Sequence, residues 1–233
     1  MSTQTLERPA AKPKRGRGLP FWIGTALILA GLVVLGYVAW QFFGTNIVAQ
    51  QKQQKLVEQT EQAWRSEGDA GATGKVEGVE PDGASALIRI PRFGKKYVMP
   101  VQDSVSESVL AEGYGHFPDS ANPGEVGNYA LAAHRVTHGE PLRDMPELRP
   151  GDKILVETKK ATYTYRLDTD PNKLTVTFKD VWVIDPLPTN PNGGVEPAQQ
   201  PGQKLITLTT CAELFHTDNR MIAFGHLVET TPR

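Results

Sequence analysis

The residues best suited to chemistry in this chain are a cysteine, a histidine and an arginine that stand at the ends of strand-like runs. Cys211 is the only cysteine in 233 residues and ends the run K-L-I-T-L-T-T-C. A lone cysteine forms no intramolecular disulfide and is a poor metal cage, so it is either a small buried side chain or a nucleophile. His134 ends the run Y-A-L-A-A-H, and Arg220 opens the run R-M-I-A-F-G-H-L-V. Together the three residues suggest acyl transfer through a thiol.

Each of the three residues also has an ordinary structural interpretation. Free cysteine is often fully buried, a single histidine is commonly a surface residue, and an arginine at a strand start is usually a solvated charge. Their combination favours function, because an imidazole at the mouth of a sheet suits general acid–base work. A planar cation near a thiol favours the thiolate and can stabilise an oxyanion. Among the other histidines, His116 lies in the turn G-Y-G-H-F-P and could line a cleft.

The N-terminal part of the chain indicates a membrane anchor. Residues 1–18 are rich in lysine and arginine and predict a basic cytoplasmic tail, and residues 19–40 are uncharged and mostly apolar. Such a stretch forms roughly 33 Å of helix, enough for a hydrocarbon core of about 30 Å. A cleaved signal peptide is the alternative, but its apolar core is shorter and ends in small residues. We therefore predict a transmembrane helix over 19–43.

Charge then predicts the topology of the chain. The basic flank precedes the apolar segment, so the N-terminus is expected in the cytoplasm and the rest of the chain outside the cell. A single thiol in an oxidising compartment is exposed to oxidation. This favours a functional role for Cys211 over that of a small buried side chain. The formal net charge of −1 gives no sign of nucleic-acid binding, and the scattered acids give no clear signal for a metal.

Residues 44–83 are expected to separate the anchor from the folded domain. The segment 46–64 is rich in glutamine, lysine and glutamate with sparse apolar positions, which predicts a polar stalk helix acting as a spacer. Residues 65–83 are rich in glycine and acids and predict a linker.

The folded domain is predicted over 84–233 and is rich in short strands. Few helices are expected there, at 104–112 and 145–148, and the Pro/Gly-rich segment 185–203 predicts a long loop that leads into the cysteine strand. Eight strands of this length indicate an all-β barrel or sandwich. The candidate strands are 86–90, 96–101, 128–134, 152–158, 161–167, 174–184, 204–210 and 220–228.

Two motifs resemble the signature of a known family. T-L-T-T-C at 207–211 with the arginine at 220, and L-A-A-H at 131–134, are similar to those of the sortases, membrane-anchored cysteine transpeptidases of Gram-positive bacteria. The resemblance covers roughly residues 84–229. The phrases at 90–101, 117–129 and 134–142 most resemble class E, the actinobacterial housekeeping-type group. Many sortases have glycine where this chain has Ala133, which is small enough to leave the site undisturbed.

The resemblance implies an eight-stranded β-barrel behind an N-terminal anchor, with no cofactor. It implies that Cys211 attacks the threonine carbonyl of a C-terminal L-P-x-T-G or L-A-x-T-G sorting signal, that His134 transfers protons and that Arg220 supports the oxyanion. Thr210, Thr209 and His116 are the candidate substrate-binding residues. The implied partners are surface proteins or pilins that carry the signal and an amine of a peptidoglycan precursor.

Other functions stay open on the sequence. L,D-transpeptidases use a His-Gly-Cys-type motif that this chain lacks, and papain-like peptidases place cysteine before histidine. A pilus-polymerising sortase is an alternative within the family. A non-catalytic, membrane-tethered surface scaffold is the alternative outside enzymes, and it predicts that Cys211→Ala keeps function.

Overall fold

The computed structural model describes residues 18–40, 45–69, 83–211 and 218–233, and Cys211 by its backbone. The chain divides into two compact units, Met1–Trp40 and Gln41–Arg233. Most of the predicted basic tail (1–17), the end of the predicted membrane segment (41–43) and most of the predicted linker (70–82) lie outside the described residues. The two units are therefore described separately.

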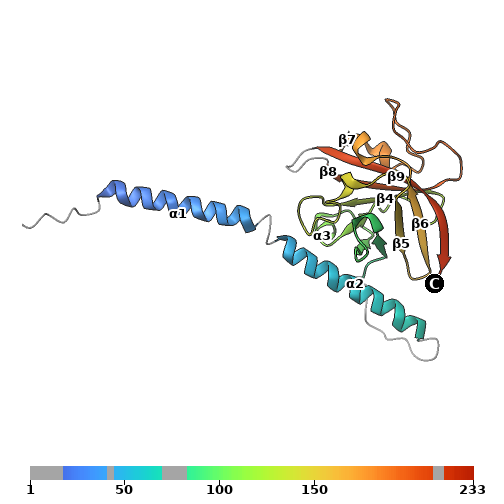
Figure 1. The fold of residues 1–233 in the computed structure, drawn as a ribbon, viewed down its shortest axis with the longest axis horizontal. Coiled ribbons are helices and arrows are strands. Elements are labelled where there is room, and N and C mark those ends of the chain that lie inside the picture. Colours follow the sequence, from blue (N-terminus) through green and yellow to red (C-terminus); the bar gives the residue numbers. More distant parts are fainter. Residues whose placement is uncertain (1–17, 41–44, 70–82, 212–217) are drawn as a thin grey trace, which may run out of the picture. The chain divides into compact units, whose positions relative to one another are not determined.

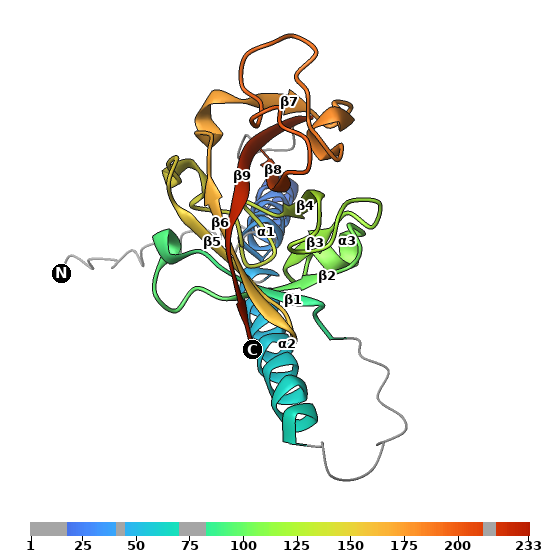
Figure 2. The same ribbon diagram turned by 90° about the vertical axis from the view of Figure 1, so that its right-hand side faces the viewer.

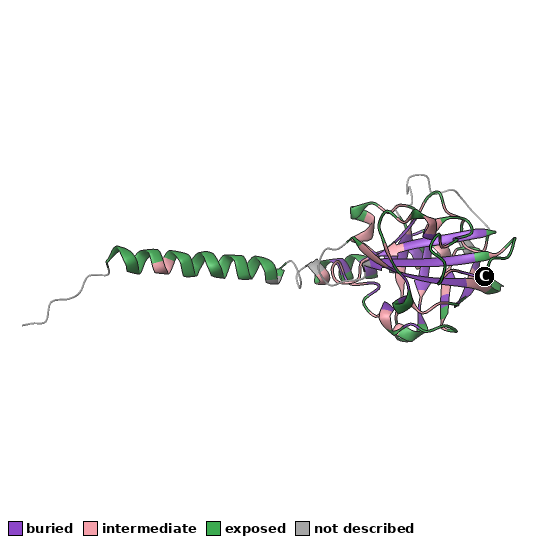
Figure 3. Cartoon of the chain, turned by 90° about the horizontal axis from the view of Figure 1, so that it is seen from above, coloured by how far each residue is buried: buried purple, intermediate pink, exposed green. Residues whose placement is uncertain are grey.

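The first unit contains the helix α1, Leu19–Ala39, which is 21 residues long. Its apolar side chains are exposed along its length (Figure 3). Within the described part of the chain, only this helix is long and apolar enough to cross a membrane. At 1.5 Å per residue it measures about 31 Å, close to the thickness of a hydrocarbon core.

The second unit is built on one nine-stranded sheet in the order β6-β5-β1-β2-β3-β4-β8-β9-β7. Figure 1 shows β5, β6 and β9 of this sheet side by side. An additional pairing between β6 and β9 closes eight of these strands into a barrel, and β7 extends from the edge of β9. This confirms the predicted eight-stranded barrel. The strands are β1 Ala86–Arg89, β2 Met99–Gln102, β3 Tyr114–His116, β4 Gly127–Ala133, β5 Lys153–Glu157, β6 Ala161–Leu167, β7 Thr175–Thr177, β8 Lys204–Cys211 and β9 Asn219–Pro232.

The long strand β9 shows how side-chain alternation builds the interior. Met221 and Ala223 belong to the main core inside the barrel, whereas Ile222 and Phe224 belong to a smaller cluster with Leu174. Successive residues of a strand point to opposite faces, so β9 serves both clusters at once. Figure 2 shows β9, in dark red, running beside β6 toward the C-terminus.

Two predicted strands differ from the structure, and one strand was not predicted. The predicted strand 174–184 is instead the short strand β7 followed by the 3-10 helix Val181–Ile184, because the Asp180 carboxylate accepts hydrogen bonds from the Thr177 backbone and hydroxyl and closes a turn. The predicted strand 96–101 begins later, at Met99. β3 was not predicted. Both predicted helices are present but shorter than predicted. The helix predicted at 104–112 is α3, Glu107–Leu110, and the one predicted at 145–148 is the 3-10 helix Met145–Glu147.

The helix α2, Thr45–Asp69, covers the predicted stalk but is not a free spacer. Leu56 and Val57 are buried in a cluster with Ala84 and Leu87 of the barrel domain. The segment is therefore not the solvated spacer that the sequence predicted, because one face of the helix is buried against the barrel.

Candidate active site

Three neighbouring strands bring the candidate residues to one end of the barrel. β4 and β8 pair in parallel, so their carboxyl ends meet at the same edge, where β4 ends at Ala133 just before His134 and β8 ends at Cys211. β9 pairs antiparallel with β8, and Cys211 and Arg220 are directly opposed. Directly paired residues in a sheet lie about 5 Å apart between Cα atoms. The topology thus brings the positions of Cys211, His134 and Arg220 to one end of the barrel.

Thr210 joins the two parallel strands next to these residues. Its hydroxyl donates a hydrogen bond to the Ala133 carbonyl at 2.7 Å, and its side chain is only 3% exposed. Because Thr210 precedes Cys211 and Ala133 precedes His134, this bond fixes the backbones on which both candidate catalytic residues stand.

A cavity of about 570 Å³ opens at this end of the barrel. His134 and Arg220 line it together with Thr209 and Thr210. Its walls come from α3, from the segment after β4 and from the β7 region. The other lining residues are Val105, Glu107, Leu110, Phe117, Ala132, Ala133, Arg135, Val136, Thr137, His138, Val176, Thr177, Phe178, Asp180, Val181, Val183, Ile184 and Ile222.

One wall of the cavity is apolar and partly open to solvent. Phe178 and Val181 line the cavity, and they are 53% and 64% exposed. The turn between them is fixed by Asp180, whose pKa is lowered by hydrogen bonds from the Thr177 hydroxyl and backbone. Large apolar side chains left exposed beside a cavity are typical of a binding surface.

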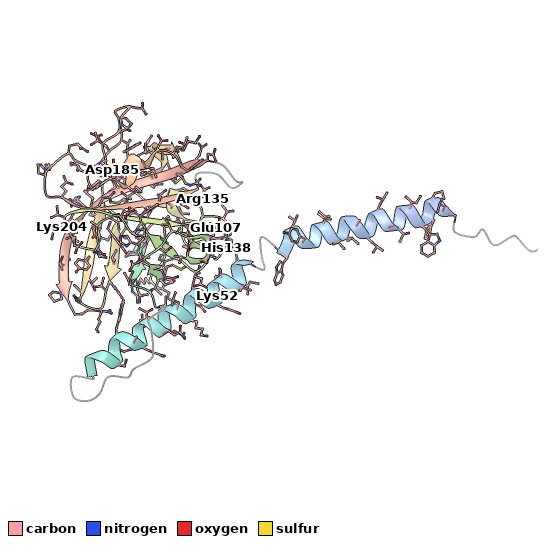
Figure 4. The ribbon with its side chains drawn as sticks, turned by 180° about the vertical axis from the view of Figure 1, so that it is seen from behind. Lys52, Glu107, Arg135, His138, Asp185 and Lys204 are labelled. Carbon is pink, nitrogen blue, oxygen red and sulfur yellow. The ribbon has the colours of Figure 1, made fainter. Side chains whose placement is uncertain are left out.

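The segment after β4 lines another part of the cavity and carries Arg135 and His138. The His138 ring stacks on the His134 ring, with centroids 4.7 Å apart and planes at 29°. Figure 4 labels His138, Arg135 and Glu107 close together at this end of the barrel. Cations and carboxylates therefore face the same cavity, which suits a peptide substrate with its polar backbone.

The predicted substrate-binding residues lie in two different places. Thr209 and Thr210 line the cavity, but His116 is not among the residues that line it. The His116 side chain is 3% exposed; Nδ1 lies 3.1 Å from an Asp103 carboxylate oxygen and Nε2 lies 3.1 Å from the Ala121 carbonyl oxygen.

Sequence reasoning missed the apolar wall and His138. Phe178 and Val181 lay within a segment that was predicted to be one strand, so no signal marked them as cavity residues. His138 follows His134 by four positions, and that spacing was the available signal for a second ring at the site.

The chain is similar in sequence to known proteins. The family described as "Sortase domain" matches residues 88–228. The chain is 34% identical over 221 residues to Sortase SrtE1 of Streptomyces coelicolor, covering 91% of this chain. It spans 58% of the length of that relative. It is also 29% identical to Sortase SrtE2 of the same organism, covering 89% of this chain and 81% of that protein.

Solved structures give the same result. Sortase E from Streptomyces avermitilis superposes with a TM-score of 0.55 at 36% identity, over 64% of this chain and 90% of that one. Sortase E1 from Streptomyces coelicolor, solved with a tripeptide in the active site, has a TM-score of 0.57 at 34% identity, over 64% of this chain and 91% of that one.

Proposed function

Because the chain belongs to the sortase family, whose members are cysteine transpeptidases, we propose that it cleaves a C-terminal sorting signal between threonine and glycine and transfers the acyl group to an amine. The observation that carries the proposal is the meeting of Cys211, His134 and Arg220 at one end of the barrel, with His134 and Arg220 lining the cavity. The class E relatives favour a housekeeping role, in which the amine belongs to a peptidoglycan precursor.

In the first half-reaction, the Cys211 thiolate attacks the threonine carbonyl carbon of the bound signal. A C–S bond forms, and the bond from this carbon to the glycine nitrogen breaks. His134 gives a proton to the leaving amine, and the product is a thioester on Cys211. Arg220, opposite Cys211 in the neighbouring strand, stabilises the negative charge on the carbonyl oxygen of the tetrahedral intermediate.

In the second half-reaction, His134 takes a proton from the incoming amine as its nitrogen attacks the thioester carbonyl. The new C–N bond forms, the C–S bond breaks and the thiolate of Cys211 is regenerated. One imidazole thus serves as acid and then as base, so no cofactor is needed to balance the protons.

The cavity suits a short peptide with an apolar residue at one end. Phe178, Val181 and Val176 offer apolar surface to the leucine and the following proline or alanine of the signal. Thr209, two residues before Cys211 in β8, lines the cavity. A tripeptide occupies the active site of the Streptomyces coelicolor relative, which supports peptide binding here.

The proposed enzyme works at the outer surface of the cell membrane. Residues 1–18 form the cytoplasmic tail, 19–43 the single membrane anchor, 44–83 the connection and 84–233 the catalytic domain. The length and apolar character of α1 and the basic residues before it support this topology.

The test incubates the full chain in detergent with L-P-x-T-G and L-A-x-T-G peptides, with and without an amine such as triglycine. Intact-mass spectrometry is expected to detect an acyl adduct on the wild-type enzyme without amine and a ligated peptide with it. Cys211→Ala is expected to abolish both. Absence of cleavage and adduct with either peptide would overturn the proposal, and full activity in Cys211→Ala would favour the scaffold alternative.

A further inference from the structure

One face of α2 is seated on the barrel domain. Ala49, Gln53, Leu56, Val57 and Thr60 are each at most 9% exposed. These positions recur every three or four residues, so they form a single stripe along the helix. Apolar contacts secure the C-terminal part of the stripe, where Leu56 and Val57 meet Ala84 and Leu87.

The N-terminal part of the same stripe holds a turn that follows the candidate catalytic histidine. Gln53 Nε2 donates a hydrogen bond to the His138 carbonyl at 2.9 Å. Asn46 Oδ1 accepts one from the Gly139 backbone at 3.0 Å, and Asn46 Nδ2 donates to Glu140 Oε1 at 2.9 Å. Two side chains of α2 therefore hold three consecutive residues of the barrel.

This turn has an unusual backbone. The φ angles of His138, Gly139 and Glu140 are 54°, 78° and 53°, and all three lie in the left-handed region. Residues other than glycine adopt that region at a cost of roughly 1–2 kcal/mol each, so such a turn persists when its surroundings fix it. The hydrogen bonds from α2 are part of those surroundings.

The contact between helix and turn is close. A Cβ atom placed on Gly139 would lie 2.5 Å from Gln53 Oε1 and 2.7 Å from its Nε2. Gln53 itself is 2% exposed and has little room to move away. Glycine at 139 thus allows both the positive φ and the approach of α2.

The turn is coupled to His134 in two ways. The His138 ring stacks on the His134 ring, as described above. The Leu142 backbone donates a hydrogen bond to the His134 carbonyl at 2.9 Å, which closes residues 134–142 into one compact loop. The Tyr97 hydroxyl donates to the Pro141 carbonyl and supports the loop from the other side. Figure 4 shows His138 of this loop near the turn of α2 that carries Lys52.

We propose that Asn46 and Gln53 of α2 are positioning residues for catalysis, acting on His134 through the turn 138–140 and the stacked His138 ring. The inference rests on the proposed role of His134. The segment that joins the anchor to the barrel is thereby a part of the catalytic apparatus, and its removal or displacement alters turnover.

The test compares steady-state kinetics of the full chain in detergent, with peptide and amine, among variants of α2. Asn46→Ala/Gln53→Ala is expected to reduce kcat about tenfold, because a misplaced acid–base group slows chemistry more than binding. The KM for the peptide is expected to stay within about twofold of the wild-type value. Lys52→Ala is the matched control on the same helix, since it breaks only an exposed ion pair with Glu112, and it is expected to keep the wild-type kcat.

A charge swap distinguishes positioning from loss of folding. Asn46→Asp places a carboxylate against Glu140 and is expected to lower kcat, whereas Asn46→Asp/Glu140→Gln restores a donor opposite an acceptor and is expected to recover it. The positioning role is overturned if the double alanine variant turns over like wild type, or if only its KM changes, while His134→Ala is inactive. An active His134→Ala enzyme instead overturns the proposed acid–base role itself, so the two failures are distinct.

Discussion

Phe178 illustrates how a single exposed side chain can serve binding without serving stability. It lies on the cavity wall and is 53% exposed. We expect Phe178→Ala to weaken binding of the sorting peptide by about 1 kcal/mol, since the ring loses the apolar area that a peptide would cover. This corresponds to roughly a fivefold rise in KM, measured by steady-state kinetics.

The control for this substitution is Val126→Ala, which removes another exposed apolar side chain, 62% exposed, that does not line the cavity. It is expected to leave KM unchanged, and both variants are expected to melt like the wild type. A Phe178→Ala enzyme with an unaltered KM would show that the peptide does not cover this wall.

The buried hydroxyl of Thr210 is expected to contribute to both stability and activity. We expect Thr210→Val to lower the free energy of unfolding by about 1–3 kcal/mol, because the Ala133 carbonyl loses its hydroxyl donor. The kcat is expected to fall as well, since this bond fixes the backbones that lead to Cys211 and His134. Urea denaturation and peptide-transfer kinetics measure the two effects.

Thr207→Val is the matched control in the same strand. The Thr207 hydroxyl is fully buried and bonds to Asn128 and the Val183 carbonyl, away from Ala133 and His134. It is expected to lose a similar amount of stability with a smaller fall in kcat. Equal losses of kcat in both variants would mean that Thr210 acts on activity only through stability.

The sequence placed Cys211, His134 and Arg220 at the ends of strand-like runs and grouped them as candidates, and the parallel pairing of β4 with β8 brings those ends to one edge. The resemblance to the sortases gave Thr209 and Thr210 as substrate-binding candidates, and both line the cavity. The sequence did not place His116, whose burial between Asp103 and Ala121 depends on how β3 enters the barrel. A tertiary contact of that kind leaves no periodic pattern in the sequence.

The turn 138–140 yields a prediction at the scale of elements. Gly139→Ala is expected to lower stability through the positive φ and, in addition, to push α2 away by contact with the Gln53 amide. We expect a loss of roughly 2 kcal/mol or more in urea unfolding, larger than the strain of a left-handed alanine alone.

Gly151→Ala isolates the strain, because Gly151 also has a positive φ, 95°, but no atom lies within 4 Å of an added Cβ. The difference between the two variants reports the contact with α2. That difference is expected to shrink when Gln53 is also changed to alanine, and a difference that persists would place the clash elsewhere.

The elements that matched the sequence are those with clear alternation or apolar runs, such as β6, β8 and the start of β9. β3 was missed because it spans three residues, Tyr114–His116, and contains a glycine. β7 was predicted too long because the side chain of Asp180 ends the strand locally, and no apolar pattern marks that turn. Local hydrogen bonds of this kind override β propensity.

At the scale of the whole molecule, the ion pair between Arg92 and Asp152 is expected to contribute to acid stability. Arg92 Nε and Nη2 donate to the two carboxylate oxygens of Asp152 at 2.9 and 2.6 Å. The pKa of Asp152 is lowered mainly by the hydrogen bond from the Arg92 side chain. The hydrogen bond from the Arg149 backbone lowers it further. A carboxylate with a lowered pKa stabilises the fold at pH values above its ordinary pKa. This contribution is lost at lower pH, as the carboxylate is protonated.

We therefore expect Arg92→Ala to lower the urea midpoint at pH 7 relative to the wild type. The gap between the two proteins is expected to shrink as the pH falls below 3.8, the ordinary pKa of this carboxyl. It closes below the lowered pKa of Asp152 in the wild type, where this carboxyl is neutral in both proteins. Arg65→Ala, which removes an exposed helix pair with Glu61, is the control and is expected to change little. A gap that stays constant with pH would contradict the assignment.

The place of α2 in the molecule was the largest difference between the sequence interpretation and the structure. Its buried stripe contains Gln53, Thr60 and Ala49 beside only two adjacent large aliphatic residues, so the segment resembled a solvated spacer. Gln53 can be buried because the barrel supplies a hydrogen-bond partner, the His138 carbonyl. Thr60 can be buried because its hydroxyl donates to the Leu56 carbonyl within the helix. Polar burial depends on partners far away in the chain, which a local pattern does not reveal.

The closure of the barrel by β9 has a consequence for how the enzyme is made. β9 pairs with β6 and β8 and carries Arg220 opposite Cys211, so the final strand of the described fold both seals the barrel and completes the proposed site. Arg220, the proposed oxyanion partner, is synthesised after His134 and Cys211 because it follows both in the sequence. The proposed site is therefore incomplete until β9 has been synthesised and has paired with β8.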